Sequence, residues 1–116
     1  MDARAAPRAR LSPRVAAAVA DAKAGLEALY GDRLVRVVLY GSQARGDAGP
    51  GSDVDLLAVL RGDIYWYDEI RRTGALHMSL LLEHDVPICI QPYAEAVVDA
   101  QASPFLANVF EDGINL

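Results

Sequence analysis

Two aspartates separated by one residue, Asp53 and Asp55, stand at the start of an apolar run at residues 54–60. Because side chains alternate between the faces of a strand, we expect both carboxylates to point to the same side. At about 6 Å and an effective dielectric constant near 20, two such charges repel by roughly 3 kcal/mol. A divalent cation between them reverses the sign, and hard carboxylate oxygens suit Mg²⁺ or Mn²⁺. The spacing therefore predicts a metal site at Asp53 and Asp55.

A glycine and a serine, Gly41 and Ser42, directly follow a second apolar run at residues 34–40. Glycine lets the backbone approach a ligand closely, and successive amide N–H groups in such a turn bind anions. The Ser42 hydroxyl adds a donor, and a helical turn after it would point its N-terminus at the same anion. Arg45 either helps to neutralise the anion or pairs with Asp47. A phosphate cradle beside a metal predicts a nucleoside triphosphate as the ligand.

The hydrophobic pattern and the cap signals predict the elements that position these residues. Ser12 and Pro13 signal the start of a helix, and Gly31 signals its end. The apolar runs predict three strands, and the helical spacing predicts three further helices and one helical turn: strands at 34–40, 54–60 and 86–91, helices at 65–84, 94–100 and 105–112, and the turn at 43–47. This order predicts an α/β (α+β) fold with a small mixed β-sheet packed with helices.

Length and composition set limits on the class of protein. The chain has 116 residues, of which 53% are hydrophobic and 23% charged, as expected for one globular domain at residues 12–116 after a flexible Arg/Ala-rich tail at residues 1–11. We find no apolar run long enough for a membrane span and no secretion signal. Cys89 is the only cysteine, which fits a reducing cytoplasm. The net charge of −5 argues against general nucleic-acid binding.

The spacing of these motifs resembles a known family. Gly41-Ser42, then ten residues, then Asp53-Val54-Asp55 is similar to the signature of the minimal nucleotidyltransferases, in the DNA polymerase β-like superfamily. The strings G-S-Q-A-R-G and S-D-V-D-L-L, which contain Arg45 and Ser52, are also typical of it. The resemblance implies a polymerase β palm-like fold and transfer of a nucleoside monophosphate from a triphosphate to an acceptor hydroxyl. It implies metal binding by the two aspartates and nucleotide binding by Gly41, Ser42, Arg45 and Ser52.

The resemblance also implies a third carboxylate on the next core strand, which would bring a second metal. Strand alternation would place Asp85, Pro87, Cys89 and Gln91 on one face, with Asp85 at the strand's entrance. Asp85 is therefore the candidate third catalytic and metal-binding residue. If the position belongs in mid-strand, Cys89 or Pro87 occupies it and the metal set is incomplete. Glu83 is a weaker substitute, because we expect it on the preceding helix.

Small members of the family are often antitoxins. They partner a helical HEPN-type ribonuclease toxin and silence it by attaching AMP to a tyrosine, so the resemblance implies ATP, Mg²⁺ and such a toxin as ligands and partner. The first alternative is a catalytically weak module that neutralises or regulates its partner by binding alone. A second is a homodimer that nucleotidylates a small molecule held between its subunits.

Three consecutive aromatic residues, Tyr65, Trp66 and Tyr67, cannot all face one core from a helix, because neighbouring side chains lie about 100° apart. They either pack at the start of the helix or contact a protein partner or a nucleobase.

Overall fold

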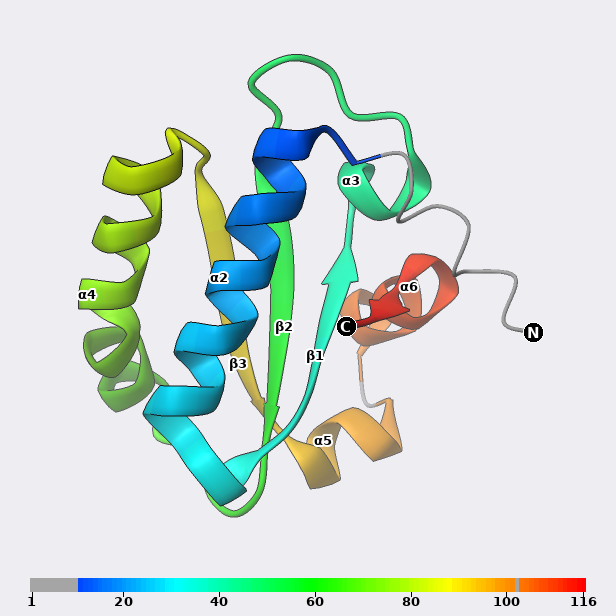
Figure 1. The fold of residues 1–116 in the computed structure, drawn as a ribbon. Coiled ribbons are helices and arrows are strands. Elements are labelled where there is room, and N and C mark those ends of the chain that lie inside the picture. Colours follow the sequence, from blue (N-terminus) through cyan, green and yellow to red (C-terminus); the bar gives the residue numbers. More distant parts are fainter. Residues whose placement is uncertain (1–10, 102) are drawn as a thin grey trace.

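The computed structural model describes residues 11–101 and 103–116, so the predicted tail lies outside the described part of the chain except for Leu11. The described residues form helices on both faces of one sheet (Figure 1). Their order along the chain is α2 (Pro13–Tyr30), η1 (Gly31–Arg33), β1 (Leu34–Tyr40), α3 (Ser42–Arg45), β2 (Val54–Leu60), α4 (Trp66–His84), β3 (Ile88–Ala94), α5 (Glu95–Ala100), α6 (Pro104–Asp112) and β4 (Ile114–Asn115).

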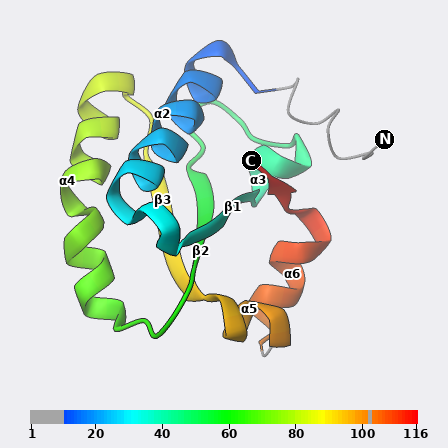
Figure 2. The same ribbon diagram turned by 60° about the horizontal axis from the view of Figure 1, so that its bottom comes forward.

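The sheet has four strands in the order β3-β2-β1-β4. Strand β1 runs antiparallel to β2 and to β4, whereas β2 and β3 are parallel. Helices α2 and α4 cover one face, and α5 and α6 cover the other (Figures 1 and 2). The expectation of a mixed sheet packed with helices is thus confirmed.

Alternation along β2 divides the core into two layers. Leu56, Ala58 and Leu60 pack in the cluster that includes α2 and α4, while Leu57 and Val59 pack with residues of α5 and α6. All five are essentially inaccessible to solvent. Because Asp55 alternates with Leu56, its side chain belongs to the face of α5 and α6.

A buried hydrogen bond fastens α2 to α4. The Tyr30 hydroxyl donates to Glu69 Oε1 at 2.8 Å, and only 3% of Glu69 is exposed. Arg72 and Arg33 lie 3.2 and 3.7 Å from the same carboxylate. The two arginines supply the positive charge that a buried carboxylate requires. Burial, followed by the bond to Glu69, raises the pKa of Tyr30.

We expect Tyr30→Phe to lower the free energy of unfolding by about 1.5–3 kcal/mol, since the lost bond is to a charged group inside the protein. Urea denaturation measures this change. Tyr67→Phe is the control, because Tyr67 is 69% exposed and should change stability by less than about 0.5 kcal/mol. Equal urea midpoints for the two variants would contradict this role of Tyr30.

Two expectations need correction, and one short strand was not predicted. The third strand runs from Ile88 to Ala94 rather than over 86–91, and it continues through Pro92. A proline is tolerated there because β3 is an edge strand. No pattern in the sequence predicted the two-residue strand β4. Of the two alternatives for the aromatic run, packing at the helix start is wrong, because Tyr65, Trp66 and Tyr67 are 68%, 57% and 69% exposed.

No helix within residues 11–101 and 103–116 combines the length and the apolar character that crossing a membrane requires.

Candidate active site

The two aspartates lie where β2 begins, next to the end of β1. Asp55 is the second residue of β2, and Asp53 is an exposed residue immediately before the strand. Burial raises the pKa of Asp55, the Asp53 carboxylate raises it further, and Arg45 opposes the change. The Asp53 carboxylate is therefore close enough to act on Asp55, and a neighbouring positive charge favours the ionised form of Asp55.

The Gly41-Ser42 turn lies directly against the Asp55 carboxylate. Gly41 has φ +75° and ψ −157°, a conformation that is nearly restricted to glycine. A Cβ atom at Gly41 would lie 2.5 Å from Asp55 Oδ2, so the absence of a side chain lets the turn approach the carboxylate. The Gly41 carbonyl accepts the Arg45 N–H at 3.1 Å, which starts α3. The chain thus holds its predicted phosphate turn against its predicted metal ligand.

Arg45 is held by two carboxylates. Its Nε atom donates to Asp47 Oδ2 at 3.1 Å, and its Nη1 atom donates to Asp112 Oδ2 at 3.4 Å. The predicted pairing with Asp47 is therefore present, and Asp112 adds a link from α3 to the end of α6. Since Arg45 also lowers the pKa of Asp55, its positive charge acts on the aspartate pair.

Ser52 closes a turn in the loop between α3 and β2. The Gly49 N–H donates to Ser52 Oγ at 2.9 Å, and the Ser52 N–H donates to the Gly49 carbonyl at 3.1 Å. Ser52 also lines a cavity of about 750 Å³ between this loop, the start of α2 and residues 85–87. In this structure its hydroxyl shapes the loop that leads into Asp53.

Asp85 lies outside β3, so the expectation that it shares a strand face with Cys89 and Gln91 is wrong. It is the residue that ends α4, with φ +55°, and its N–H donates to the Leu81 carbonyl at 2.9 Å. Its side chain is 90% exposed and lies 3.9 Å from Arg14. Asp85 lines the 750 Å³ cavity together with Ser52.

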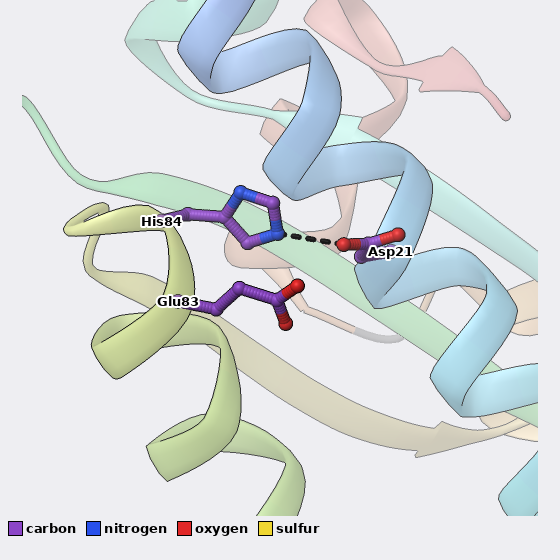
Figure 3. A group of neighbouring side chains, drawn as sticks. All are labelled: Asp21, Glu83 and His84. Carbon is purple, nitrogen blue, oxygen red and sulfur yellow. Dashed lines mark hydrogen bonds and ion pairs between the residues drawn. The ribbon is translucent and has the colours of Figure 1, made fainter.

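One group of three potential metal ligands occurs among the described residues, and it contains neither Asp53 nor Asp55. It consists of Asp21 on α2 and Glu83 and His84 on α4, whose ligand atoms all lie within 4.8 Å of one another (Figure 3). His84 Nε2 is 2.7 Å from Asp21 Oδ2, so this pair links the two helices. Glu83, the substitute considered for the third carboxylate, belongs to this group.

Two side chains flank Asp55 in the sheet, and the sequence analysis did not predict that they lie together. Tyr40 on β1 and Cys89 on β3 are the residues paired with Asp55 in the sheet, so the three share one face. Burial, followed by the charge of Asp55, raises the pKa of Tyr40. Tyr40 could have been found from the sequence, because it is the last residue of the predicted first strand and directly precedes Gly41. Cys89 is the second residue of β3 and lies next to the predicted metal ligand.

A known protein family and two solved structures resemble this chain. The sequence profile of a family described as Nucleotidyltransferase domain matches residues 20–109. The fold is similar to that of a structure described as a toxin-antitoxin with AMP-PNP, with a TM-score of 0.58 and 18% identity over 82% of this chain and 69% of that one. It is also similar to a candidate nucleotidyltransferase from Sulfolobus solfataricus, with a TM-score of 0.55 and 17% identity over 99% of this chain and 86% of that one. No curated protein matches the sequence. Because the profile spans most of the chain, the protein belongs to the nucleotidyltransferase domain family.

Proposed function

We propose that this protein is a metal-dependent nucleotidyltransferase that transfers AMP from ATP to an acceptor hydroxyl. The observation that carries the proposal is the contact between Gly41 and Asp55, where a Cβ atom would lie 2.5 Å from the carboxylate. This contact places a turn suited to phosphate next to a carboxylate pair suited to a divalent cation. Membership of the nucleotidyltransferase domain family supports the same reaction class.

The residues at the site fit one Mg²⁺ or Mn²⁺ ion. Asp53 and Asp55 supply hard oxygen ligands, and a cation beside them would oppose the effect of burial and of the Asp53 charge, which raise the pKa of Asp55. A divalent ion bound there would neutralise the triphosphate and the charge that develops on the leaving group. Gly41 and Ser42 would hold the β- and γ-phosphates, Arg45 would add positive charge, and Ser52 would order the loop before Asp53.

The reaction exchanges one bond at the α-phosphorus for another. The acceptor oxygen forms a bond to the α-phosphorus, while the bond from that phosphorus to the bridging oxygen of the β-phosphate breaks. Pyrophosphate leaves, and the acceptor proton passes to water. The Gly41-Ser42 turn binds the leaving group, and the aspartate pair would hold the divalent ion that keeps the α-phosphate in line between the leaving group and the acceptor.

A second metal has no complete ligand set at this site. Among the described residues, no group of three potential ligands within 4.8 Å includes Asp53 or Asp55. The residue of β3 that pairs with Asp55 is Cys89 rather than a carboxylate, and the Asp85 side chain is exposed at the end of α4. We therefore assign catalysis to Asp53 and Asp55, with Asp85 as the third carboxylate only if its replacement abolishes transfer.

Asp85→Asn tests this assignment. We expect the variant to keep ATP binding and transfer within about twofold of wild type, because an exposed ion pair at 3.9 Å contributes little. Radiolabel transfer from [α-³²P]ATP measures the effect, with Asp99→Asn as a matched change at another exposed aspartate that pairs with an arginine. Loss of transfer in Asp85→Asn alone would make Asp85 the third carboxylate.

We further propose that the acceptor is a helical HEPN-type toxin and that the protein acts as its antitoxin. The structural similarity to a toxin-antitoxin with AMP-PNP supports a protein partner and an adenine nucleotide. The alternative, a module that neutralises its partner by binding alone, is favoured by the cysteine at position 89.

Co-expression with a helical ribonuclease encoded beside this chain separates the two functions. If the protein is a transferase, the ribonuclease is silenced and its mass increases by whole AMP units, and both effects disappear with Asp53→Asn. If it is a binding module, the ribonuclease is silenced at unchanged mass, and Asp53→Asn has no effect.

A further inference from the structure

The outer side of α4 carries apolar side chains that the rest of the chain leaves uncovered. Among the described residues, nine large hydrophobic side chains are exposed, and six of these belong to α4 or directly precede it: Tyr65, Trp66, Tyr67, Met78, Leu81 and Leu82. In Figures 1 and 2, no described helix or strand lies beyond α4 on this side. Because two thirds of the exposed large hydrophobic side chains gather at one helix, they mark an interaction surface.

Helical spacing arranges part of this surface as a stripe. Positions 67, 71, 74, 78 and 81 follow one another at intervals of three or four residues, and positions 75 and 82 border the same face of the helix. We call the seven residues, all of them exposed, the α4 stripe: Tyr67, Arg71, Gly74, Ala75, Met78, Leu81 and Leu82. The opposite face of α4 carries Glu69, Thr73 and Leu80, which are buried. A surface helix has one apolar face toward its own core, whereas α4 presents a second one to solvent.

We propose that the α4 stripe binds the α4 stripe of a second copy of this chain, with the two helices antiparallel about a twofold axis at Met78. In such an isologous contact, a residue before Met78 faces the residue equally far after Met78 in the second copy. The stripe from position 67 to position 82 is about 22 Å long, so it supplies about four helical turns to the contact. The inference goes beyond the proposed function, because it concerns the assembly of the protein and not its reaction.

The sizes of the side chains are complementary across that axis. Gly74 and Ala75 lie three and four residues before Met78, and Leu81 and Leu82 lie three and four residues after it. The two leucines of each copy therefore face the glycine and the alanine of the other copy. Large side chains that meet small ones across two helices pack as knobs into holes. The α4 stripe thus has the pattern that packing against itself requires.

Gly74 provides the hole. Glycine destabilises the interior of a helix relative to alanine, and a Cβ atom at Gly74 would meet no heavy atom of this chain within 4 Å. Packing within the chain therefore does not explain the glycine, whereas close approach of another helix does. Gly74 also lines a groove of about 280 Å³ whose lining includes Asp53. In the proposed dimer, Leu81 of the second copy enters this groove, which places the second copy beside the candidate active site.

The charges at the two ends of the contact are complementary as well. Arg71 lies seven residues before Met78 and Asp85 lies seven residues after it, so each arginine faces the aspartate of the other copy. The Arg71 guanidinium carbon lies 5.9 Å from the centre of the Tyr67 ring, and Arg71 forms no ion pair within the described part of the chain. The Asp85 side chain is 90% exposed, and its contact with Arg14 is at 3.9 Å. A second copy therefore matches the α4 stripe in both size and charge.

Analytical ultracentrifugation over a wide range of protein concentrations tests the interface. We expect the wild-type chain to associate into a species of twice its mass. Met78→Glu brings two carboxylates together at the axis and should weaken the dimer at least about 100-fold, because like charges opposed in an interface are strongly unfavourable. Ser79→Glu is the matched control, since Ser79 is exposed on the same helix but lies outside the α4 stripe. This control should dimerise as the wild type does.

Exchange of the terminal charges tests the antiparallel arrangement. Arg71→Glu and Asp85→Lys should each weaken the homodimer about tenfold, because each turns two attractive pairs into two repulsive ones. An equimolar mixture of the two variants should form heterodimers instead, since each introduced charge then faces its opposite. Native mass spectrometry separates the three dimers by mass. Thermal melts establish that each variant is folded before its association is compared.

Three results would overturn the proposal. The first is a wild-type chain that stays monomeric at every concentration, including one that instead binds the helical ribonuclease through Met78, because the α4 stripe would then belong to that partner. The second is a Met78→Glu variant that dimerises as well as Ser79→Glu does. The third is a mixture of the two charge variants that forms no more heterodimer than homodimer, which contradicts the antiparallel arrangement. None of these measurements involves a nucleotide, so their failure is distinct from a failure of the proposed function.

Discussion

Replacing both Asp53 and Asp55 by asparagine should abolish the Mg²⁺-dependent binding of ATP and, at the same time, raise the thermal stability of the protein. Binding should weaken at least about 100-fold, since both carboxylates are the proposed metal ligands and even residues that only support such ligands contribute about 10–100-fold to metal affinity. Asparagine keeps the shape of the side chain, so the strand can form as before. Isothermal titration calorimetry with ATP, with and without Mg²⁺, measures the loss.

The gain in stability follows from the sign of the pKa change at Asp55. Burial and the Asp53 charge raise the pKa of Asp55 in the folded state above its usual value of 3.8. The folded state therefore binds protons more tightly than the unfolded state. The stability that this group contributes is fully present below the unfolded pKa, and it is lost as the pH rises through the folded pKa. At neutral pH the ionised pair is a cost that asparagine removes.

The control is the double variant Asp32→Asn and Asp63→Asn, which changes the net charge equally. Both residues are exposed and lie in the turns before β1 and after β2, at the other end of these strands from the aspartate pair. We expect this control to bind ATP as wild type does. If the variant at 53 and 55 still bound ATP with the same Mg²⁺ dependence, or melted at a lower temperature than wild type, the role assigned to the pair would be incorrect.

Gly41→Ala should disrupt both the site and the backbone that forms it. The new methyl group would lie 2.5 Å from Asp55 Oδ2, so the carboxylate must move. The backbone conformation at φ +75° is also strained for alanine, at a cost of about 1–3 kcal/mol. Displacing a positioning group by about 1 Å can reduce a rate about 100-fold, and we expect at least a tenfold weaker affinity for Mg²⁺-ATP.

Gly62→Ala separates the two effects. Gly62 has φ +83°, and a Cβ atom there would meet nothing within 4 Å. The variant should lose stability from backbone strain and bind nucleotide normally. Thermal melts establish that both variants are folded before their affinities are compared. An unchanged affinity in Gly41→Ala, or equal losses in the two variants, would contradict a specific role for the contact with Asp55.

Local signals in the sequence predicted most of the elements correctly. Ser12 and Ser103 each precede a proline, and each serine side chain accepts a backbone N–H at the start of its helix, as a cap should. The strands at 34–40 and 54–60 match β1 and β2, because both are buried runs with clear ends. These features depend on residues that are neighbours in the chain, so they can be predicted from the sequence alone.

Features that depend on contacts between distant segments were predicted less well. Asp85 and Cys89 are four residues apart, so strand alternation would place them on one face. Asp85, however, ends α4 in a left-handed conformation and therefore lies outside β3. The edge position of β3, which allows Pro92 inside a strand, follows from the order of the sheet and not from the residues around the proline. Likewise, the approach of Gly41 to Asp55 brings the residue after β1 against a residue of β2, which only the fold reveals.

The most direct test of nucleotidyl transfer is to compare ATP labelled at the α- and γ-phosphates. The purified protein is incubated with Mg²⁺, the helical ribonuclease proposed as its partner and either label, and the Asp53→Asn/Asp55→Asn variant is run alongside. We predict that the α-label becomes covalently attached to the partner, that the γ-label leaves as pyrophosphate, and that the variant attaches neither. Attachment of the γ-label, or attachment of the α-label at an equal rate by the variant, would contradict nucleotidyl transfer at Asp53 and Asp55.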